Sequence, residues 1–197
     1  MKYTKQLLIF LGFFMFIACD SFVDVDLPDS QLTGSIVFED RSTANAAVTE
    51  IYGKMRDGAM LTGSTLGTGV SLGLYADEWI YYGTGDENAL FLFNNSLRDD
   101  TSSVSQLWNE SYQIIYSANA IILGCQNSTA LSETDKKQFI GEAVFVRALM
   151  HFYLVNLYGD VPYITSTDYE VNRLVKRIPT TQVYNYIIED LKQAIVS

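Results

Sequence analysis

Two long helical patterns joined by a short polar turn constrain this chain more than any other feature. Over about residues 104–123 and again over about 133–158, apolar residues recur at the spacing of one helix face. At 1.5 Å per residue, these helices would be about 30 and 39 Å long. Because the turn between them is short, we expect an antiparallel pair. Shorter patterns at about 41–57 and 180–196 make the predicted fold all-α.

The expected helix ends follow from capping residues and glycines. The predicted N-caps are Asp40 or Ser42, Ser103 with Gln106 as a capping box, Ser132, and Thr180 or Thr181. The predicted stops are Gly58, Gly124, and Gly159 with Pro162. The helix at 180–196 reaches the last residue without a C-cap, so we expect residues 41–197 to be a helical region truncated at its C-terminus.

Residues 58–101 carry no long helical period and are interrupted by many glycines. We expect a long irregular loop, in which the sequence allows one short helix or strand near residues 70–80. Loops of this length in a compact domain are often functional. The stretch GSTLGTGVSLG at 63–73 lacks the spacing and the lysine of a phosphate-binding loop, so we predict a flexible loop there.

The stretch RALMHFYLVNLYGDVPYIT at 147–165 is too apolar for a surface helix. Its uncharged run is too short to cross a bilayer and contains His151 and Asn156, so we predict a helix packed on several sides. Arg147 and His151 lie four residues apart on one face. A buried guanidinium needs a partner, and the candidates are Glu110, Glu189 and Asp190. Because no nucleophile motif accompanies His151, we predict a structural role and no catalytic residue.

The N-terminus has the pattern of a secretion signal. Lys2 and Lys5 precede the apolar run LLIFLGFFMFI at 7–17, which ends at Ala18 and Cys19. This pattern predicts a lipoprotein signal peptide over residues 1–18, with acylation of Cys19; the alternative is an ordinary signal peptide beside a chance cysteine. The acidic, turn-rich residues 19–40 are predicted to be a tether and extended segment.

Cysteine content and charge exclude some classes of site and partner. With Cys19 acylated, Cys125 has no disulfide partner and is predicted to be a core residue, and one histidine with one cysteine cannot form a metal site. Loss of Lys2 and Lys5 changes the formal net charge from −10 to −12. Such a chain repels phosphates, so we expect no nucleic-acid partner.

The stretch DEWIYYGTGDENALFLFNN at 77–95 is the candidate binding segment. Its aromatic residues Trp79, Tyr81 and Tyr82 lie between two acidic pairs, and flat rings beside carboxylates and amides suit sugar binding. Two alternatives stay open. The aromatic residues can belong to the core, which we favour for Phe91 and Phe93. A glycosidase could use two of the acidic residues Asp77, Glu78, Asp86 and Glu87.

Three further stretches carry a family resemblance. FIGEAVFVRALMHFYLVNLYGDVPYI, RIPTTQVYNYIIEDLKQA and LWNESYQIIYSANAII resemble the signature of the SusD/RagB family of outer-membrane nutrient-uptake lipoproteins. The first matches the pattern EA-x-F-x-RA followed by an aromatic-G-x-VP stop, and the third matches W-x3-Y-x2-I-x2-AN-x-I. The spacing of Ala148 with Phe152 also fits tetratricopeptide (TPR) repeats.

The resemblance implies TPR-like helix pairs with loop-rich segments packed on them. It implies a surface lipoprotein anchored by lipid to the outer membrane, which captures glycans, or in some members peptides, for a TonB-dependent SusC-like transporter. No enzymatic activity and no cofactor are implied. Because family members are more than twice as long, the chain resembles their N-terminal portion, and a docking fragment without its own ligand site is an alternative. The implied glycan contacts are Asp77, Trp79, Tyr81, Tyr82 and Asn88.

Overall fold

The computed structural model describes residues 36–64, 67–98 and 101–197. The predicted signal peptide, Cys19 and most of the predicted tether lie outside these ranges. The helices are η2 (Ile36–Phe38), α2 (Arg41–Asp57), α3 (Thr68–Tyr75), α4 (Glu87–Phe93), α5 (Ser102–Asn127), α6 (Glu133–Tyr158), α7 (Tyr169–Asn172) and α8 (Thr180–Val196). The described ranges contain a single β-bridge, Val161 with Ile178, and no named strand. The all-α prediction is confirmed.

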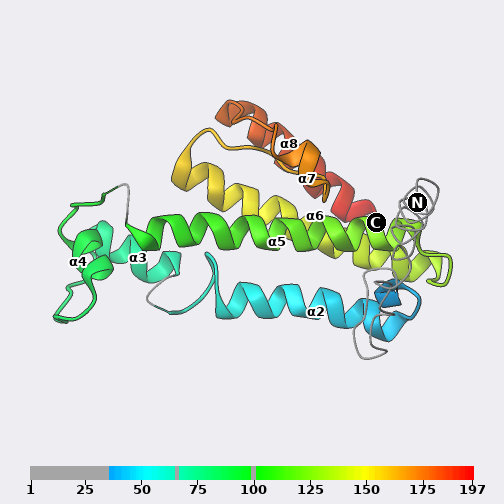
Figure 1. Ribbon diagram of the computed structural model, residues 1–197, viewed down its shortest axis with the longest axis horizontal. Helices are drawn as coiled ribbons and strands as arrows, with labels where there is room; N and C mark the ends of the chain where they lie inside the picture. Colours follow the sequence, from blue (N-terminus) through cyan, green and yellow to red (C-terminus); the bar gives the residue numbers. More distant parts are fainter. Residues whose placement is uncertain (1–35, 65–66, 99–100) are drawn as a thin grey trace, which may run out of the picture. The chain divides into compact units, whose positions relative to one another are not determined.

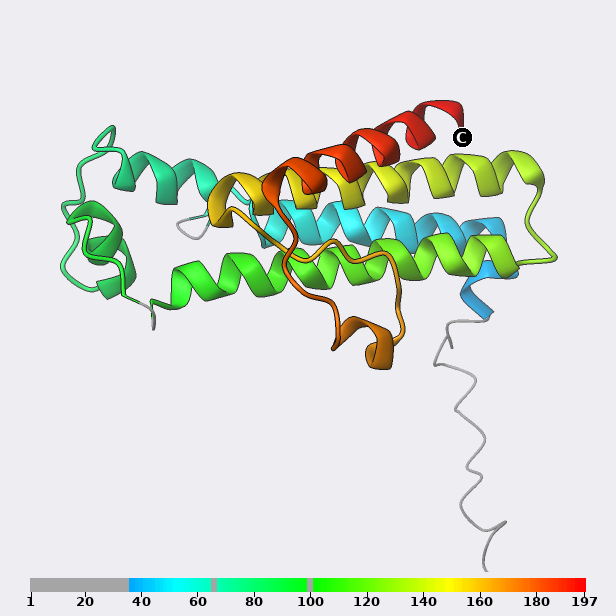
Figure 2. The same cartoon turned by 90° about the horizontal axis from the view of Figure 1, so that it is seen from above.

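The helices α5 and α6 form the predicted antiparallel pair, and the other long helices pack against it. Helix α2 lies against both α5 and α6, whereas α8 lies against α6. Figures 1 and 2 show the four helices side by side, with α3 near the N-terminal end of α5 and α4 beyond it. The connection from α6 to α8 carries α7 and crosses over α5 (Figure 2).

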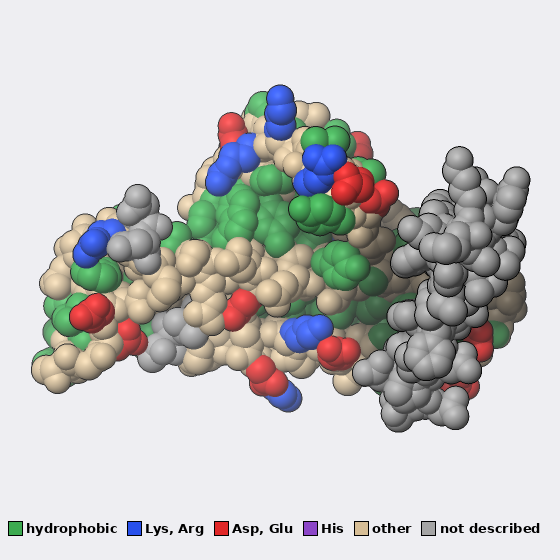
Figure 3. Space-filling view, viewed as in Figure 1, with side chains coloured by type: hydrophobic (Ala, Val, Ile, Leu, Met, Phe, Trp, Pro, Cys, Tyr) green, Lys and Arg blue, Asp and Glu red, His purple; other side chains and the backbone are tan. Residues whose placement is uncertain are grey.

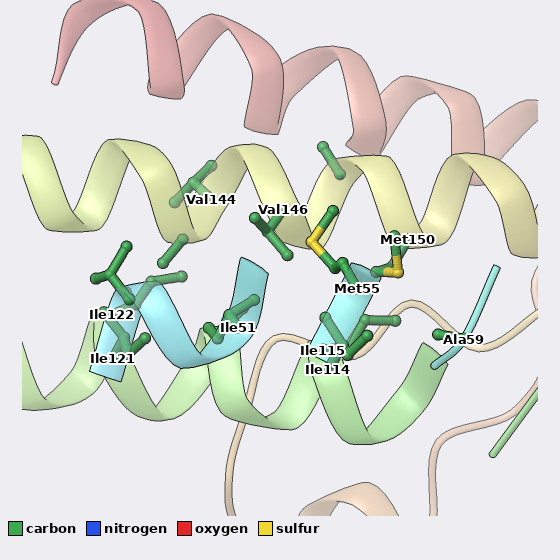
Figure 4. Packing of buried hydrophobic residues seen from close by; sticks show 14 of the residues in the cluster. Ile51, Met55, Ala59, Ile114, Ile115, Ile121, Ile122, Val144, Val146 and Met150 are labelled. Carbon is green, nitrogen blue, oxygen red and sulfur yellow. The ribbon is translucent and has the colours of Figure 1, made fainter. Parts of the chain in front are cut away.

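The core fills the space between α2, α5 and α6. In Figure 4 apolar side chains of the three helices point toward one another. Helix α2 contributes Ala44, Val48, Ile51 and Met55, which recur at the spacing of one helix face. Cys125 is fully buried in this core, as predicted, and burial raises the pKa of its thiol to about 11. The thiol is therefore protonated at neutral pH and unreactive.

Helix α5 extends beyond its predicted range at both ends. The prediction that Gly124 ends the helix is wrong, because α5 continues to Asn127. Gly124 instead makes room for Phe38: a Cβ at this position would lie 2.2 Å from ring atoms of Phe38. The predicted capping role of Ser103 is also wrong, since Thr101 precedes the helix and Ser103 is buried within its first turn. Phe38, predicted to lie in an extended tether, ends a 3-10 turn and enters the core.

The ends of α6 and α8 agree with the predicted ranges, but one cap differs. Ser132 caps α6 by accepting the N–H of Asp135 at 3.1 Å, and Gly159 ends it with a φ of 70°. The predicted capping of α8 by Thr180 or Thr181 is wrong. Asp160 supplies the cap, because its Oδ1 accepts both the N–H and the hydroxyl of Thr180 at 2.9 Å. One short segment therefore ends α6 and begins α8.

Helix α6 has the length and hydropathy of a membrane-spanning helix, the only one in the described ranges that does. Within the bundle, 56% of its apolar window is buried. Helices α5 and α8 pack along it and α2 adds further contacts, which accounts for apolar residues on nearly every face. The predicted burial on several sides is confirmed.

Candidate ligand-binding loop

Arg147 and His151 belong to a buried structural network, as predicted. The Arg147 guanidinium donates two hydrogen bonds of 2.7 Å to Asp190 on α8 and one of 2.9 Å to Asn119 on α5. The Asp190 carboxylate also accepts the Tyr163 hydroxyl at 2.6 Å. The partner of Arg147 is therefore Asp190 and not Glu110 or Glu189, and the network ties three helices together.

His151 lies inside the bundle with no exposed surface. Its Nε2 accepts the backbone N–H of Ile164 at 3.2 Å, so Nδ1 carries the proton and donates to the carbonyl of Arg147 at 2.9 Å. Burial is the main reason that the pKa of this imidazole falls to about 4. A neutral, enclosed imidazole with both nitrogens engaged has a structural role. The described ranges also hold no group of three or more His, Cys, Asp or Glu side chains suited to a metal ion.

The predicted contacts lie in a small lobe built by α3, α4 and the loop between them. Its own apolar cluster consists of Leu74, Ala89 and Leu92, with Val70, Tyr81 and Phe93 packed around them. The sequence allows a short helix or strand near residues 70–80, but no pattern in it predicts α4. A helix of seven residues is too short to show a helical period. The lobe lies at the end of the bundle where α5 begins (Figures 1 and 2).

Trp79 is held on the end of α3. Asp77 has a φ of 59° and turns the chain back on the helix. The N–H groups of Glu78 and Trp79 then both donate to the carbonyl of Gly73, at 3.0 and 3.1 Å. The indole lies over Gly73, where a Cβ would stand 3.2 Å from ring atoms. Trp79 remains 51% exposed, so a fixed aromatic surface faces solvent.

The two tyrosines that follow have different environments. Tyr81 packs in the lobe's cluster, and its hydroxyl accepts the N–H of Asp86 at 3.1 Å. Tyr82 is 87% exposed. The structure therefore brings Trp79 and Tyr82 to the surface and gives Tyr81 a mainly structural position. Three more exposed apolar residues of the lobe were not singled out from the sequence: Leu72, Tyr75 and Ile80.

Some polar side chains of the lobe form hydrogen bonds that stabilise it. Asp86 caps α4 by accepting the N–H groups of Asn88 and Ala89 at 3.0 and 3.2 Å. The Asn88 side-chain carbonyl accepts the Ser102 hydroxyl at 3.0 Å, which links α4 to the start of α5. Asn88 is thus placed at the junction of lobe and bundle. Asp77 is exposed beside Trp79 in the chain, where its carboxylate is open to solvent.

The positions of these acidic residues give little support to the glycosidase alternative. Such an enzyme needs two carboxyl groups free to act on the scissile bond. The carboxylate of Asp86 is used to cap α4, and neither Asp77 nor Glu78 is enclosed by the protein. Glu87 is exposed as well, so the lobe presents exposed aromatic rings together with exposed carboxylates.

Comparison with known proteins identifies the family. Residues 81–196 match the family described as SusD-like, starch-binding and associating with the outer membrane. The chain belongs to the SusD-like family. It is 26% identical to SusD-like protein P25 of Formosa agariphila, over 94% of this chain and 36% of that protein. It is 25% identical to a SusD-like protein of Bacteroides ovatus, over 98% of this chain and 34% of that one. The chain thus spans about a third of these relatives.

Solved SusD-like structures share the same helical fold. A SusD superfamily protein of Parabacteroides distasonis superposes with a TM-score of 0.65 at 26% identity, over 85% of this chain and 35% of that one. A laminarin-binding SusD-like protein gives a TM-score of 0.62 at 24% identity, over 79% of this chain and 33% of that one. Proteins of this family bind carbohydrate and are not catalysts. The family predicted from the sequence is confirmed.

Proposed function

We propose that this chain is the N-terminal helical part of a surface lipoprotein that binds an oligosaccharide and delivers it to a TonB-dependent SusC-like transporter without chemical change. The family description, starch-binding and associated with the outer membrane, supports both the ligand class and the location. The laminarin-binding SusD-like protein with the same fold supports a glycan as the ligand.

The main support for glycan binding is the set of exposed aromatic rings in the α3–α4 lobe. Trp79 is fixed by packing on Gly73 and by its backbone hydrogen bond, yet half of it faces solvent. A sugar ring has an apolar face that packs on a flat aromatic surface, while its hydroxyl groups hydrogen-bond to carboxylates and amides. Tyr82 and Asp77 supply a second ring and an acceptor on the same loop. Because Trp79 is already ordered, binding costs little conformational entropy at this residue.

Anchoring and delivery are further parts of the proposal. Acylation of Cys19 would attach the protein to the outer membrane, and two or more acyl chains would make the attachment stable. The acidic composition, with a formal net charge of −10, argues against nucleic acid as a partner. The SusC-like transporter is the partner that the family relationship supports.

A binding screen tests the ligand claim. Isothermal titration of the purified protein with a panel of oligosaccharides should give a saturable signal for at least one glycan. Trp79→Ala and Tyr82→Ala should each weaken that binding by about tenfold or more, the usual effect of removing an aromatic anchor. Tyr169→Ala removes another exposed tyrosine, on α7, which is 74% exposed against 87% for Tyr82, and should leave the affinity unchanged. Binding to peptides and to no glycan would reassign the ligand class.

A second assay separates ligand capture from docking. A cognate SusC-like barrel should retain the wild-type protein in a pull-down. If the barrel also retains Trp79→Ala while the glycan affinity is lost, capture and docking are separable functions of this chain. If no glycan binds and the barrel is still retained, the chain is a docking component only. Turnover of a labelled oligosaccharide would contradict the non-enzymatic part of the proposal.

A further inference from the structure

One face of α5 is unusual in a protein this acidic. From Ser111 to Ser132 the chain carries no charged residue and no histidine. Within α5 the single charged residue is Glu110, and its carboxylate is occupied by the N–H of Ala59 and by Gln106. The solvent face of a helix in a soluble domain normally carries charged side chains. An open face with no free charge therefore calls for a physical explanation.

This face forms the floor of a groove. Trp108, Tyr112 and Tyr116 follow one another at four-residue intervals, about 6 Å apart along the helix axis. All three line a hollow of about 280 Å³ under the connection that carries α7. Tyr112 and Tyr116 also line a hollow of about 660 Å³ beside Lys54 of α2. Tyr116 lines a third hollow, of about 450 Å³, toward η2. Tyr116 is the residue that all three hollows share, and each hollow is lined by further residues of α5.

The aromatic floor combines two fixed rings with one open ring. The Arg177 guanidinium lies 4.7 Å above the Trp108 ring, and the Tyr112 hydroxyl donates to the carbonyl of Pro162 at 2.8 Å. Tyr116 is 53% exposed and makes neither a ring contact nor a side-chain hydrogen bond within the described part of the chain. The groove therefore presents a free aromatic face next to a rigid wall.

The polar side chains of α5 form two sets, one buried in the bundle and one along the groove. Two buried ones form hydrogen bonds: Asn119 bonds to Arg147 and to the carbonyl of Ile164, and the Ser111 hydroxyl donates to the carbonyl of Leu107. The buried hydroxyl of Ser103, in the first turn, has no partner among the described residues. Along the groove, Asn109, Gln113 and Ser117 have no side-chain partner among the described residues. These side chains offer amide and hydroxyl groups, as donors and acceptors, directly beside the aromatic ladder.

Charged side chains lie at the edges of the groove: the Arg177 guanidinium stands over Trp108, and Glu39 lines the third hollow. Lys54 is the single charged side chain that lines the two hollows along Trp108, Tyr112 and Tyr116, and its ammonium lies 2.9 Å from the carboxylate of Glu50. In Figure 3 green and tan atoms cover the middle of α5, and red and blue atoms appear at its margins. The middle of the groove, at Tyr112 and Tyr116, is lined by uncharged side chains and by the paired Lys54, so an uncharged ligand is favoured there.

We propose that this groove, centred on Tyr116, is a second glycan site that binds a segment of an uncharged oligosaccharide. The inference rests on the proposed function, since it assumes that the protein binds glycans. A ladder of rings flanked by amides matches a polymer whose repeating units each have an apolar face and hydroxyl groups. Tyr116 lies about 21 Å along α5 from its first residue, whereas the α3–α4 lobe lies at that end. A long chain that reaches both sites would bind more tightly than a short one.

Titration of the uniformly ¹⁵N-labelled protein with uncharged hexasaccharides tests the site. Malto-, laminari-, cello-, xylo- and mannohexaose are the probes, with an oligogalacturonate of equal length as the charged comparison. At least one neutral hexamer should shift the side-chain amide signals of Asn109 and Gln113, and the acidic hexamer should not. Tyr116→Ala should remove those shifts and weaken hexamer binding by about tenfold, whereas Tyr169→Ala should do neither.

The outcomes separate this site from the loop site. Hexamer binding that survives Tyr116→Ala but not Trp79→Ala overturns the groove and leaves the proposed function intact. Loss of hexamer binding in Tyr116→Ala, with binding kept in Trp79→Ala, supports the groove and contradicts the loop contacts. Absence of binding by every neutral hexamer overturns both. If Tyr116→Ala abolishes retention by a SusC-like barrel and leaves glycan binding unchanged, the groove is a protein contact and the inference is wrong. Circular dichroism confirms that each variant is folded.

Discussion

Removal of the Asp190 side chain should strongly destabilise the bundle. Asp190 receives two hydrogen bonds of 2.7 Å from Arg147 and one of 2.6 Å from Tyr163, so Asp190→Ala leaves the guanidinium with Asn119 as its one side-chain partner. The side chains of Arg147 and Asp190 are only 8% and 10% exposed. Water therefore cannot replace the lost carboxylate without opening the contact between α6 and α8.

The expected cost follows from this burial. Breaking a buried ion pair by removing one partner typically costs about 3–5 kcal/mol, because an uncompensated charge is left in the interior. An exposed ion pair contributes about 0–1 kcal/mol. Arg173 and Glu170, paired at 2.6 Å with both side chains exposed, provide the matched control on the same protein. A domain is typically stable by about 5–15 kcal/mol, so the variant is expected to fold at reduced stability.

Urea denaturation followed by circular dichroism measures both effects. We expect Asp190→Ala to lower the free energy of unfolding by about 3–5 kcal/mol, Asp190→Asn by less, and Glu170→Ala by under about 1 kcal/mol. The double variant Arg147→Met with Asp190→Leu removes both charges and should cost less than Asp190→Ala. A loss of under about 1 kcal/mol in Asp190→Ala would refute the claim that the ion pair is buried and essential to the α6–α8 contact.

Three other changes test individual contacts. Because burial holds the pKa of His151 near 4, below its ordinary value of 6.5, stability should be full above pH 6.5 and fall by about 2 kcal/mol between pH 6.5 and 5. His151→Gln, which leaves no histidine in the chain, should flatten that profile, and parallel profiles would contradict the assignment. Gly124→Ala should lower the melting temperature, because a clash with Phe38 costs about 1–3 kcal/mol. Gly53→Ala is the control: it lies in open space on α2 and should raise the melting temperature. A higher melting temperature in both variants would contradict the contact between Gly124 and Phe38. Asp160→Ala should cost about 1 kcal/mol in urea denaturation by uncapping α8, and an unchanged midpoint would exclude that role.

Local sequence rules predicted the long helices well. Helices α2, α6 and α8 occupy the expected ranges: α2 and α8 have several turns of apolar periodicity, and α6 has a clear cap at Ser132 and a stop at Gly159. The rules failed where a distant residue decides the outcome. Gly124 is followed by another turn of α5 because it faces Phe38, and α8 is capped by Asp160 from the segment before it. Contacts between residues far apart in the sequence leave no signal in the local pattern.

The candidate site was predictable in composition but not in arrangement. The sequence singled out the aromatic residues of the 77–95 loop, and the structure exposes Trp79 and Tyr82. It could not show that Tyr81 packs inside the lobe or that Asn88 bonds to Ser102, since both depend on the fold of α3 and α4. The charge-free face of α5 was visible in the sequence. Only the structure shows that this face is open and grooved.

The affinity of the Trp79→Ala/Tyr82→Ala double variant shows whether the exposed rings of the α3–α4 lobe bind the glycan. Isothermal titration should compare it with the wild type, using the oligosaccharide that the wild type binds most tightly, with the Tyr169→Ala variant as the control. The account predicts a loss of about a hundredfold or more, because two aromatic anchors are removed together, and no loss in the control. Equal affinities of the double variant and the wild type would contradict the claim that the exposed rings of the α3–α4 lobe bind the glycan.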